Sequence, residues 1–332
     1  MKPHHLNDSQ SKSSSFKWLA TSFVNDYSGE QTRYFSLSAS NDLVKAETCQ
    51  PRNLSFLIDK PKHRTALISF PGSGNTWMRH LIQELTGFYT GSVYQDKGLA
   101  ENGFPGELVP VIDSTRHCIV YKTHLATKQT LKLFTKAIII IRNPLHAIKS
   151  FFNYEYATKG NSAKRQRLEN GDRRVKDLIS SNKTKSRSKH VDHANTSLFH
   201  TRKWSDFVDD RLRRWRRKNV FWLEKFQHNS IVVLYESLKG NNSAELLRIG
   251  EFLGVQVKPK DLLCTIVNKE GQFHRQARNK TASSVVSLYT SKQKEEIRKS
   301  VCEVSHVAKS LSIDLDISQY LVKLSKKNDT HC

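Results

Sequence analysis

The sequence predicts a single α/β domain in which a P-loop-like parallel β-sheet is flanked by helices on both faces. Three observations support this fold. Short, continuously apolar segments alternate along the chain with segments of helical periodicity, a pattern typical of parallel strands buried on both faces. A glycine-bracketed loop joins the first such strand to the first such helix. At 332 residues, the chain is long enough for one large domain.

Composition divides the chain into three parts. Residues 1–60 are polar and Ser-rich, and they predict a poorly ordered arm. The α/β domain is expected over residues 61–325. Within it, residues 158–195 are rich in Lys, Arg and Ser and poor in apolar side chains. This stretch predicts a basic flexible insertion, which is either functional or simply a solvated loop.

The first strand, loop and helix follow one another from residue 65. The run TALISF over 65–70 predicts a buried strand, and PGSGNTW over 71–77 predicts a phosphate loop. Apolar residues then recur at helical spacing as far as Leu85, and Gly87 ends the helix.

Three further strands are predicted along the chain. They are CIVYKTH over 118–124, AIIIIRN over 137–143 and SIVVLYES over 230–237. A helix fits between the first two, and Pro144 suits the first turn of another. A long helix over about 202–226 precedes the last strand.

The glycine loop predicts a phosphate site. Gly72 and Gly74 let backbone N–H groups approach an anion, and the following helix start adds a favourable dipole. The lysine and the spacing of a Walker A loop are absent, so a single terminal phosphate fits better than a metal-bound triphosphate. Taken alone, the loop could also be only a tight turn between strand and helix.

Polar residues at two strand ends predict a site beside this loop. Lys122 and His124 lie at the carboxyl end of one predicted strand, where open parallel sheets bind ligands. Arg142 follows the next strand, and Ser150 lies two turns into the helix after it. A guanidinium and a hydroxyl suit a second phosphate.

Together these motifs resemble the sulfotransferase family that uses 3′-phosphoadenosine 5′-phosphosulfate, PAPS. The loop is similar to the P-K-S-G-T-T-W loop of that family, KTH to its catalytic histidine strand, and Arg142 with Ser150 to its 3′-phosphate motif. The resemblance covers about Arg64 to Gln276. It is strongest for the sulfotransferase domain of WSC-domain-containing proteins, which are Golgi sialate O-sulfotransferases, although no cysteine-rich WSC module is present here.

This resemblance implies PAPS as cosubstrate, PAP as product and no metal. It implies that His124 is the general base and that Lys122 stabilises charge in the transition state. The residues implied in nucleotide binding are Ser73, Gly74, Asn75, Thr76, Trp77, Arg142, Ser150, Tyr235, Lys269 and Gly271.

Two positions depart from the family pattern. Gly72 stands where the general family loop has a lysine, which leaves open which group stabilises the leaving phosphate. Glu270 stands where the late nucleotide loop usually has a cation, so Arg275 or Arg278 is expected to supply that charge.

Charge and sequence motifs bear on the partner and the compartment. The net charge of +23 indicates an anionic partner, and the resemblance implies a carbohydrate acceptor, possibly a sialylated glycan, and no nucleic acid. The resemblance also implies the Golgi as the compartment, with membrane association possible through a segment not seen in this sequence. No signal peptide or membrane span is visible in the sequence itself. Seven N-x-[ST] motifs agree with the secretory pathway or arise by chance. In that compartment Cys264 and Cys302 are the preferred disulfide pair.

Two other functions are considered. One is a non-catalytic polyanion- or glycosaminoglycan-binding protein with the same fold, which would use its basic insertion and basic helix to hold heparin-like chains or nucleic acid. Under the sulfotransferase interpretation, the basic cluster over 211–218 either attracts an anionic glycan or is in part solvated surface. The other is a P-loop kinase or NTPase, disfavoured by the missing loop lysine and by the lack of an evident magnesium-binding acid after a strand.

Overall fold

The computed structural model describes residues 49–113, 115–157, 191–240, 243–273, 275, 285–321, 324 and 332. Residues 1–48 of the predicted arm, and residues 158–190 of the predicted insertion, lie outside the described residues. Contacts divide the chain into Met1–Gln50 and Pro51–Cys332, and the fold is that of the second unit. Within the predicted arm, Ser55 and Leu57 form isolated β-bridges with Phe88 and His117.

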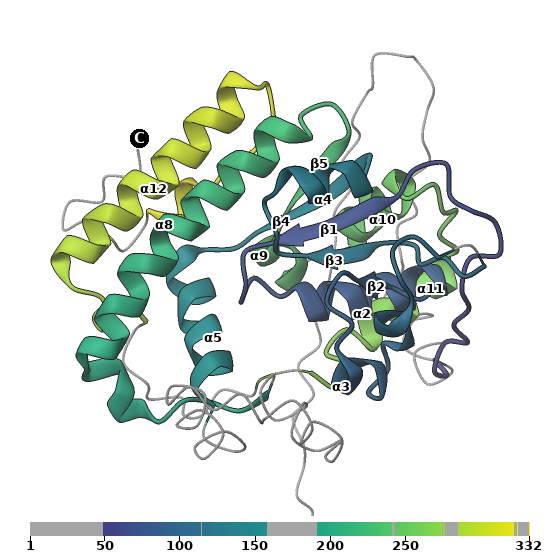
Figure 1. Ribbon diagram of the computed structural model, residues 1–332, viewed down its shortest axis with the longest axis horizontal. Coiled ribbons are helices and arrows are strands. Elements are labelled where there is room, and N and C mark those ends of the chain that lie inside the picture. The colour runs from purple at the N-terminus through teal and green to yellow at the C-terminus, as the bar shows by residue number, and fades with distance from the viewer. Residues whose placement is uncertain are drawn as a thin grey trace, which may run out of the picture. The chain divides into compact units, whose positions relative to one another are not determined.

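The centre of the domain is a five-stranded parallel sheet in the order β2-β3-β1-β4-β5 (Figure 1). The strands are β1 (Thr65–Ser69), β2 (Gly91–Ser92), β3 (Tyr121–Thr123), β4 (Lys136–Ile141) and β5 (Ser230–Leu234). Strand β1 pairs with both β3 and β4. The phosphate loop that follows β1 therefore lies in the middle of the carboxyl edge of the sheet.

Both faces of the sheet are buried, as the apolar runs predict. Along β1, Ala66 and Ile68 belong to one hydrophobic cluster, whereas Leu67 between them belongs to another. Strand β4 alternates in the same way, with Ile139 on the first face and Ile138 on the second. Alternation with period two places successive side chains on opposite faces, so both layers of helices are needed to cover the sheet.

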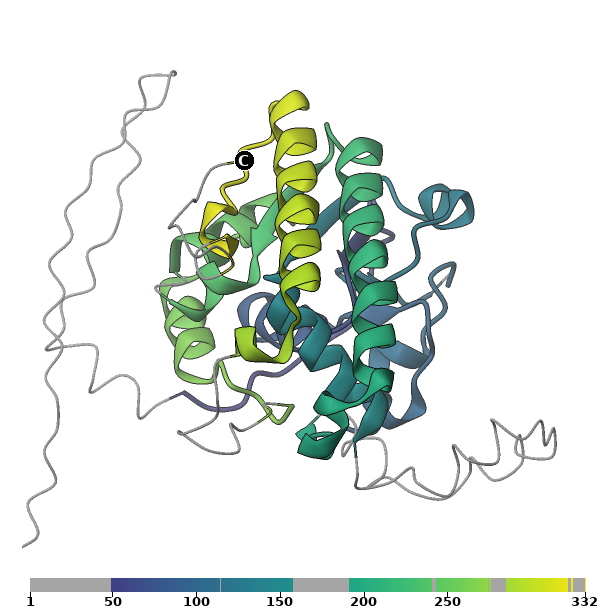
Figure 2. The ribbon, with the colours of Figure 1, turned by 90° about the vertical axis from the view of Figure 1, so that its left-hand side faces the viewer.

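Helices cover the two faces in separate groups (Figure 1). The first face is covered by α5 (Pro144–Tyr156), α8 (Arg202–Lys225) and α12 (Ser291–Ser310). Figure 2 shows α8 and α12 running side by side. The second face is covered by α2 (Asn75–Thr86), α9 (Tyr235–Lys239), α10 (Ser243–Phe252) and α11 (Pro259–Val267). The shorter elements are α3 (Lys97–Ala100), α4 (Lys128–Leu133), η1 (Pro105–Leu108), η3 (Thr196–His200), η4 (Val285–Leu288) and η5 (Ser318–Tyr320).

The predicted helix limits agree with the local signals. Gly87 adopts a φ of 76° at the end of α2, where its N–H donates to the carbonyl of Gln83. Pro144 occupies the first turn of α5, and the side chain of Asn143 caps the N–H of Leu145.

Two predicted strands are shorter than expected. The run over 118–124 forms a strand only at Tyr121–Thr123. The run over 230–237 ends at Leu234, because Tyr235 begins helix α9. The carboxylate of Glu236 in the first turn of that helix accepts bonds from the Asn143 N–H and the Tyr320 hydroxyl. These tertiary contacts hold the chain in a helix where the sequence alone favours a strand.

The predicted disulfide is wrong. Cys302 is bonded to Cys332, 30 residues further along the chain, and Cys264 is held in a different disulfide. The disulfide joins Cys332 to helix α12, a contact that cysteine spacing does not encode. Cys118 is a free, buried thiol, as its place in an apolar run predicts.

Among the described residues, no helix combines the length and the apolar character that crossing a membrane requires.

A buried ion pair fastens the segment after α2 to that helix. Arg79 and Glu107 are both fully buried and bonded to each other. The guanidinium of Arg79 also donates to the hydroxyl and the carbonyl of Thr90, and it lies over the ring of Phe104 at 4.4 Å. The other carboxylate oxygen of Glu107 accepts from the N–H of Asp96 at 3.1 Å. The pair thus connects α2, β2, α3 and η1.

We expect Glu107→Gln to lower the free energy of unfolding by about 3–5 kcal/mol, because it leaves the buried Arg79 charge without its counterion. The control is Glu295→Gln, which breaks the solvent-exposed pair with Arg298 and should change stability by less than about 1 kcal/mol. Urea unfolding followed by circular dichroism measures both. Equal losses would contradict this account of the buried pair.

Candidate active site

The phosphate loop is held tightly between β1 and helix α5. Gly72 and Gly74 have φ values of 86° and 88°, in the left-handed region that favours glycine. A Cβ atom at Gly72 would lie 2.2 Å from the carbonyl oxygen of Ala147 and 2.8 Å from the nitrogen of Phe151. Both are backbone atoms of α5 and cannot move aside alone. The loop therefore has no room for a lysine side chain at residue 72.

Several donors at the start of α2 have no partner among the described residues. The first helical bond runs from the Met78 N–H to the carbonyl of Gly74, so the N–H groups of residues 75–77 lie ahead of the helical ladder. The Ser73 hydroxyl is buried, and no described residue bonds to it. By contrast, the amide of Asn75 donates inward to the Leu67 carbonyl and the Ser69 hydroxyl. These backbone donors and the Ser73 hydroxyl make the loop suited to an anion.

His124 is fixed in one tautomer by the end of β1. Its Nδ1 lies 2.7 Å from the carbonyl oxygen of Ser69 and 3.3 Å from the hydroxyl of the same residue. A carbonyl oxygen can only accept, so Nδ1 carries the proton and donates it. Nε2 is then the unprotonated nitrogen of the neutral ring, able to accept a proton from a bound hydroxyl.

Lys122 and His124 lie close enough to influence each other electrostatically. Burial lowers the pKa of Lys122 to about 8, and the positive charge of Arg79 adds to that effect. Burial and then the charge of Lys122 lower the pKa of His124 to about 3, with a smaller contribution from Lys218. The imidazole is therefore neutral at physiological pH. An anion bound beside Lys122 would offset that charge and raise the pKa of the ring again.

Tyr94 and Lys218 belong to this side of the site, although sequence reasoning assigned neither to it. The Tyr94 hydroxyl accepts from the backbone N–H of His124 at 2.7 Å, and its ring lies 5.7 Å from the imidazole. The Nζ of Lys122 is 5.6 Å from the centre of the same ring. The ammonium of Lys218, from α8, donates to the His124 carbonyl. No motif marks Tyr94, whereas Lys218 ends the basic cluster over 211–218.

A second cluster lies on the other side of the loop. Arg142, just after β4, donates to the carbonyl of Gly72 at 2.8 Å and lies over the ring of Tyr235 at 4.0 Å. That ring covers Gly74, where a Cβ atom would lie 2.5 Å from it, and packs edge-on against Trp77 at 5.2 Å. Arg142 Nε is buried, and no group in the described part of the chain bonds to it.

Ser150 joins this cluster through Arg275. The guanidinium of Arg275 donates to the Ser150 hydroxyl at 3.0 Å and to the carbonyl of Asp192 at 2.9 Å. Burial and the positive charge of Arg142 lower the pKa of Arg275 to about 10. Two guanidinium groups that repel each other beside one serine are a suitable site for a doubly charged anion. Arg278, the other predicted cation, lies outside the described residues.

The late nucleotide loop packs against α2. The indole N–H of Trp77 donates to the carbonyl of Lys269 at 2.5 Å, and His80 bonds to the carbonyl of Asn268 at 2.8 Å. Gly271 has a φ of 59°, and a Cβ atom there would lie 2.8 Å from the ring of His80. The backbone of Lys269 is thus brought to Trp77, and that of Gly271 to His80.

The predicted residues meet along one edge of the sheet, in the order of the strands. Lys122 lies within β3 and His124 follows it, the loop follows β1, Arg142 follows β4 and Tyr235 follows β5. Since adjacent strands lie about 5 Å apart, the histidine and the arginine are separated by roughly 10 Å, with the loop between them.

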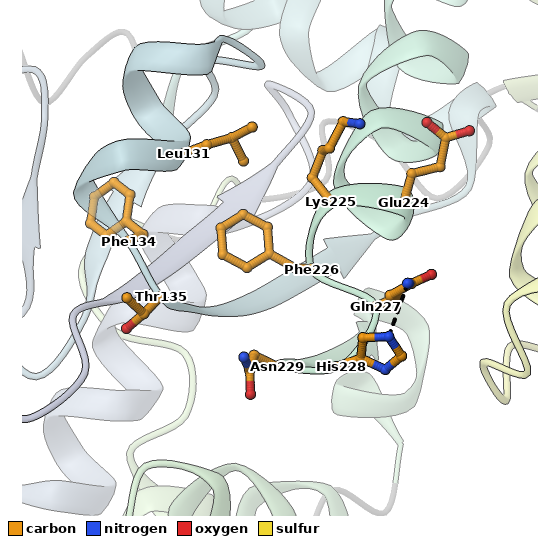
Figure 3. A pocket seen from close by; sticks show the side chains of 9 residues that line it. All are labelled: Leu131, Phe134, Thr135, Glu224, Lys225, Phe226, Gln227, His228 and Asn229. Carbon is orange, nitrogen blue, oxygen red and sulfur yellow. Dashed lines mark hydrogen bonds between the residues drawn. The ribbon is translucent and has the colours of Figure 1, made fainter.

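A hollow elsewhere on the domain is separate from this site (Figure 3). Thr135 immediately precedes β4 and Asn229 immediately precedes β5, so the hollow lies at the amino edge of the sheet. Its lining residues are Leu131, Phe134, Thr135, Glu224, Lys225, Phe226, Gln227, His228 and Asn229. None of the predicted site residues is among them.

Comparison with known proteins gives one family match and several relatives. Residues 62–305 match the model of the sulfotransferase domain. The chain is 32% identical over 234 residues to WSCD family member CG9164 of Drosophila melanogaster, covering 70% of this chain and 63% of that protein. It is 35% identical over 217 residues to WSCD family member AAEL009094 of Aedes aegypti, covering 64% of this chain and 57% of that protein. The chain thus spans about three fifths of the length of these relatives.

Two solved structures are also similar. Mouse sulfotransferase SULT7A1 complexed with PAP has a TM-score of 0.45 and 18% identity, covering 77% of this chain and 89% of that chain. Retinol dehydratase in complex with androsterone and inactive cofactor PAP has a TM-score of 0.38 and 14% identity, covering 83% of this chain and 87% of that chain.

We expect Gly72→Ala to destabilise the domain and to weaken PAP binding, because the new Cβ must push the loop away from α5. Gly254→Ala is the matched control, since Gly254 also has a positive φ of 72° but open space around a Cβ. The control carries only the backbone strain, about 1–2 kcal/mol. Urea unfolding and PAP titration measure the two variants. The account is overturned if Gly72→Ala is no more harmful than the control.

Proposed function

The chain belongs to the sulfotransferase family, and from this membership we propose that it transfers the sulfuryl group of PAPS to a hydroxyl of a carbohydrate acceptor. The observation that carries the proposal is the order of groups along the sheet edge. An imidazole with a fixed tautomer lies on one side of the glycine loop, and two guanidinium groups, Arg142 and Arg275, lie on the other. This order matches a nucleotide with two separate phosphates and an acceptor at its sulfated end.

The donor groups of the site fit PAPS. Two buried polar atoms without a partner among the described residues, the Ser73 hydroxyl and Arg142 Nε, lie in the two clusters assigned to the 5′- and 3′-phosphates. Leaving such groups unsatisfied costs about 1–3 kcal/mol each, and phosphate oxygens would satisfy them. The rings of Trp77 and Tyr235, 5.2 Å apart, would contact the base between the two phosphate sites.

Each residue of the site then has a distinct role. PAPS supplies the activated sulfuryl group. His124 Nε2 would accept the proton of the acceptor hydroxyl, while the bond from Nδ1 to the Ser69 carbonyl holds the ring in place. The ammonium of Lys122 and the N–H groups at the start of α2 would offset the charge that develops on the phosphosulfate. Because a loop lysine is excluded at Gly72, Lys122 would supply the positive charge nearest the transferred group, while Arg142 bonds to the loop itself.

The acceptor is proposed to be an anionic glycan, such as a sialylated one, and the compartment to be the Golgi. The strongly basic chain supports an anionic acceptor. The disulfide between Cys302 and Cys332 agrees with an oxidising compartment. Of the N-x-[ST] motifs in the described residues, Asn53 and Asn195 are exposed, as glycosylation would require.

The competing function is binding of polyanions without catalysis. Its support is the basic face of α8, where Arg213 and Arg214 are 71% and 57% exposed. Transfer of radiolabelled sulfate from PAPS to a panel of neutral and acidic oligosaccharides separates the two functions. A polyanion-binding protein would bind the acidic members in a salt-sensitive way and transfer nothing.

His124→Ala should separate chemistry from nucleotide binding. We expect turnover to fall by roughly 10²–10⁴, the usual effect of a general base, while the affinity for PAP stays within a few-fold. Single-turnover sulfate transfer and PAP titration measure the two quantities. A variant that retains nearly full turnover would show that another group takes the proton.

The affinity for PAP should fall as the pH rises through about 8, the pKa of Lys122 in the free protein. Below this pH the ammonium is charged and attracts the phosphate; above it, binding requires uptake of a proton, and affinity declines by up to about tenfold per pH unit. Titration between pH 7 and 10 measures the break. In Lys122→Met the affinity should be lower and the break at Lys122 absent, and an unchanged profile would assign the break to another group.

A further inference from the structure

The chain after α12 lies beyond the part that matches the sulfotransferase domain. That match ends at residue 305, and η5 follows it along the chain. Ile317 and Tyr320 are buried in the hydrophobic cluster that covers the first face of the sheet. The disulfide between Cys302 and Cys332 attaches this segment to α12 a second time. The segment is therefore part of the core, although the matched domain does not include it.

Tyr320 reaches from this segment to the sheet edge where the predicted nucleotide residues lie. It is only 2% exposed, and its hydroxyl donates to Oε2 of Glu236 at 2.6 Å. Oε1 of the same carboxylate accepts from the backbone N–H of Asn143 at 3.2 Å. Burial raises the pKa of Tyr320, and the negative charge of Glu236 raises it further, so the hydroxyl keeps its proton and donates. Each oxygen of Glu236 thus has a donor.

The carboxylate of Glu236 is close to Arg142. It bonds to the N–H of the residue after Arg142, and it belongs to the residue after Tyr235, whose ring lies under the guanidinium at 4.0 Å. The positive charge of Arg142 also acts on Tyr320, where it partly offsets the rise in pKa. The acid, the base and the hydroxyl therefore form one cluster.

Arg142 and Glu236 nevertheless do not bond to each other. The guanidinium donates to the carbonyl of Gly72 at 2.8 Å, and its buried Nε has no partner among the described residues. A buried guanidinium and a nearby carboxylate usually pair, because each has lost its hydration. Here the Tyr320 hydroxyl and a backbone N–H already occupy the two carboxylate oxygens. These two donors hold Glu236 away from the arginine.

We propose that Tyr320 is a positioning residue for the nucleotide: by binding Glu236, it keeps this carboxylate from pairing with Arg142 and leaves the guanidinium available to the 3′-phosphate. The inference rests on the proposed function, which assigns that phosphate to Arg142. It adds a residue from outside the matched domain that acts through a carboxylate and does not touch the ligand. Without the hydroxyl, Oε2 of Glu236 would bond to the guanidinium and compete with the phosphate for the same donor.

The test removes the hydroxyl and measures the affinity for two nucleotides that differ only in the 3′-phosphate. Tyr320→Phe should weaken the binding of PAP by about 10-fold, the size of one charge-assisted hydrogen bond. The affinity for adenosine 5′-phosphate, which lacks that group, should stay within a few-fold of the parent. Isothermal titration calorimetry measures both ligands.

A matched control removes another buried tyrosine hydroxyl. Tyr289 is 3% exposed, and its hydroxyl donates to the backbone carbonyl of Leu145 at 2.7 Å, so its loss frees no carboxylate. Tyr289→Phe should lower the free energy of unfolding in urea about as much as Tyr320→Phe does, since each change removes one buried hydrogen bond. It should leave the affinity for PAP within a few-fold of the parent.

A second substitution separates the charge of Glu236 from any structural role of the hydroxyl. In the Glu236→Gln background there is no carboxylate to pair with Arg142. Adding Tyr320→Phe to that background should therefore keep PAP affinity within a few-fold of Glu236→Gln alone. Loss of a structural support would weaken binding in either background.

Parent-like PAP affinity in Tyr320→Phe, an equal loss for both nucleotides, or a loss that persists beside Glu236→Gln would overturn the role of Tyr320. In each of these outcomes the parent still binds PAP, and the proposed function stands. If the parent itself does not bind PAP, the proposed function fails and this inference fails with it.

Discussion

Helix α5 lies so close to the phosphate loop that the backbone carbonyl of Ala147 would be 2.2 Å from any Cβ at residue 72. The loop can take this path only because Gly72 has no side chain and tolerates a φ of 86°. Its carbonyl then accepts from Arg142, so α5, β4 and the loop form one rigid unit. The same contact that shapes the anion site also removes the place where a loop lysine would stand, and positive charge must reach the site from other elements.

That charge comes from side chains that are buried or partly buried. Lys122 comes from β3, Lys218 from α8, and Arg142 with Arg275 from the other side of the loop. Burial and mutual repulsion lower the pKa values of both lysines and of Arg275. Such an arrangement is unfavourable without an anion and becomes favourable when one binds, because the groups are already oriented and few have to move. The free domain is therefore less stable than it would be with these charges paired, but its cations are already oriented for an anion.

The segment that carries Tyr94, next to β3, is held in place by a buried ion pair. The buried pair of Arg79 and Glu107 fastens the segment that carries Tyr94, and the Tyr94 hydroxyl in turn accepts from the backbone of His124. A fully buried pair of this kind adds little net stability but is sensitive to loss of either partner. Its role here is to hold an aromatic ring beside the imidazole and Lys122.

The sequence by itself determined the fold class, the glycine loop between β1 and α2 and the sheet edge at which the predicted residues meet. Apolar runs that alternate with helical patterns require a doubly covered parallel sheet, and the polar residues after those runs must then meet at one edge. Only the tertiary structure decided which groups surround them. Ser69 fixes the histidine tautomer, Arg275 reaches Ser150 across 125 residues, and Lys218 reaches His124 across 94. The pairing of Cys302 with Cys332 and the start of a helix at Tyr235 were decided in the same way. Periodicity in the sequence predicts which face of a helix or strand is buried. It does not predict which distant side chains contact the residues at the sheet edge, because those contacts depend on how the helices pack, and the whole core sets that packing.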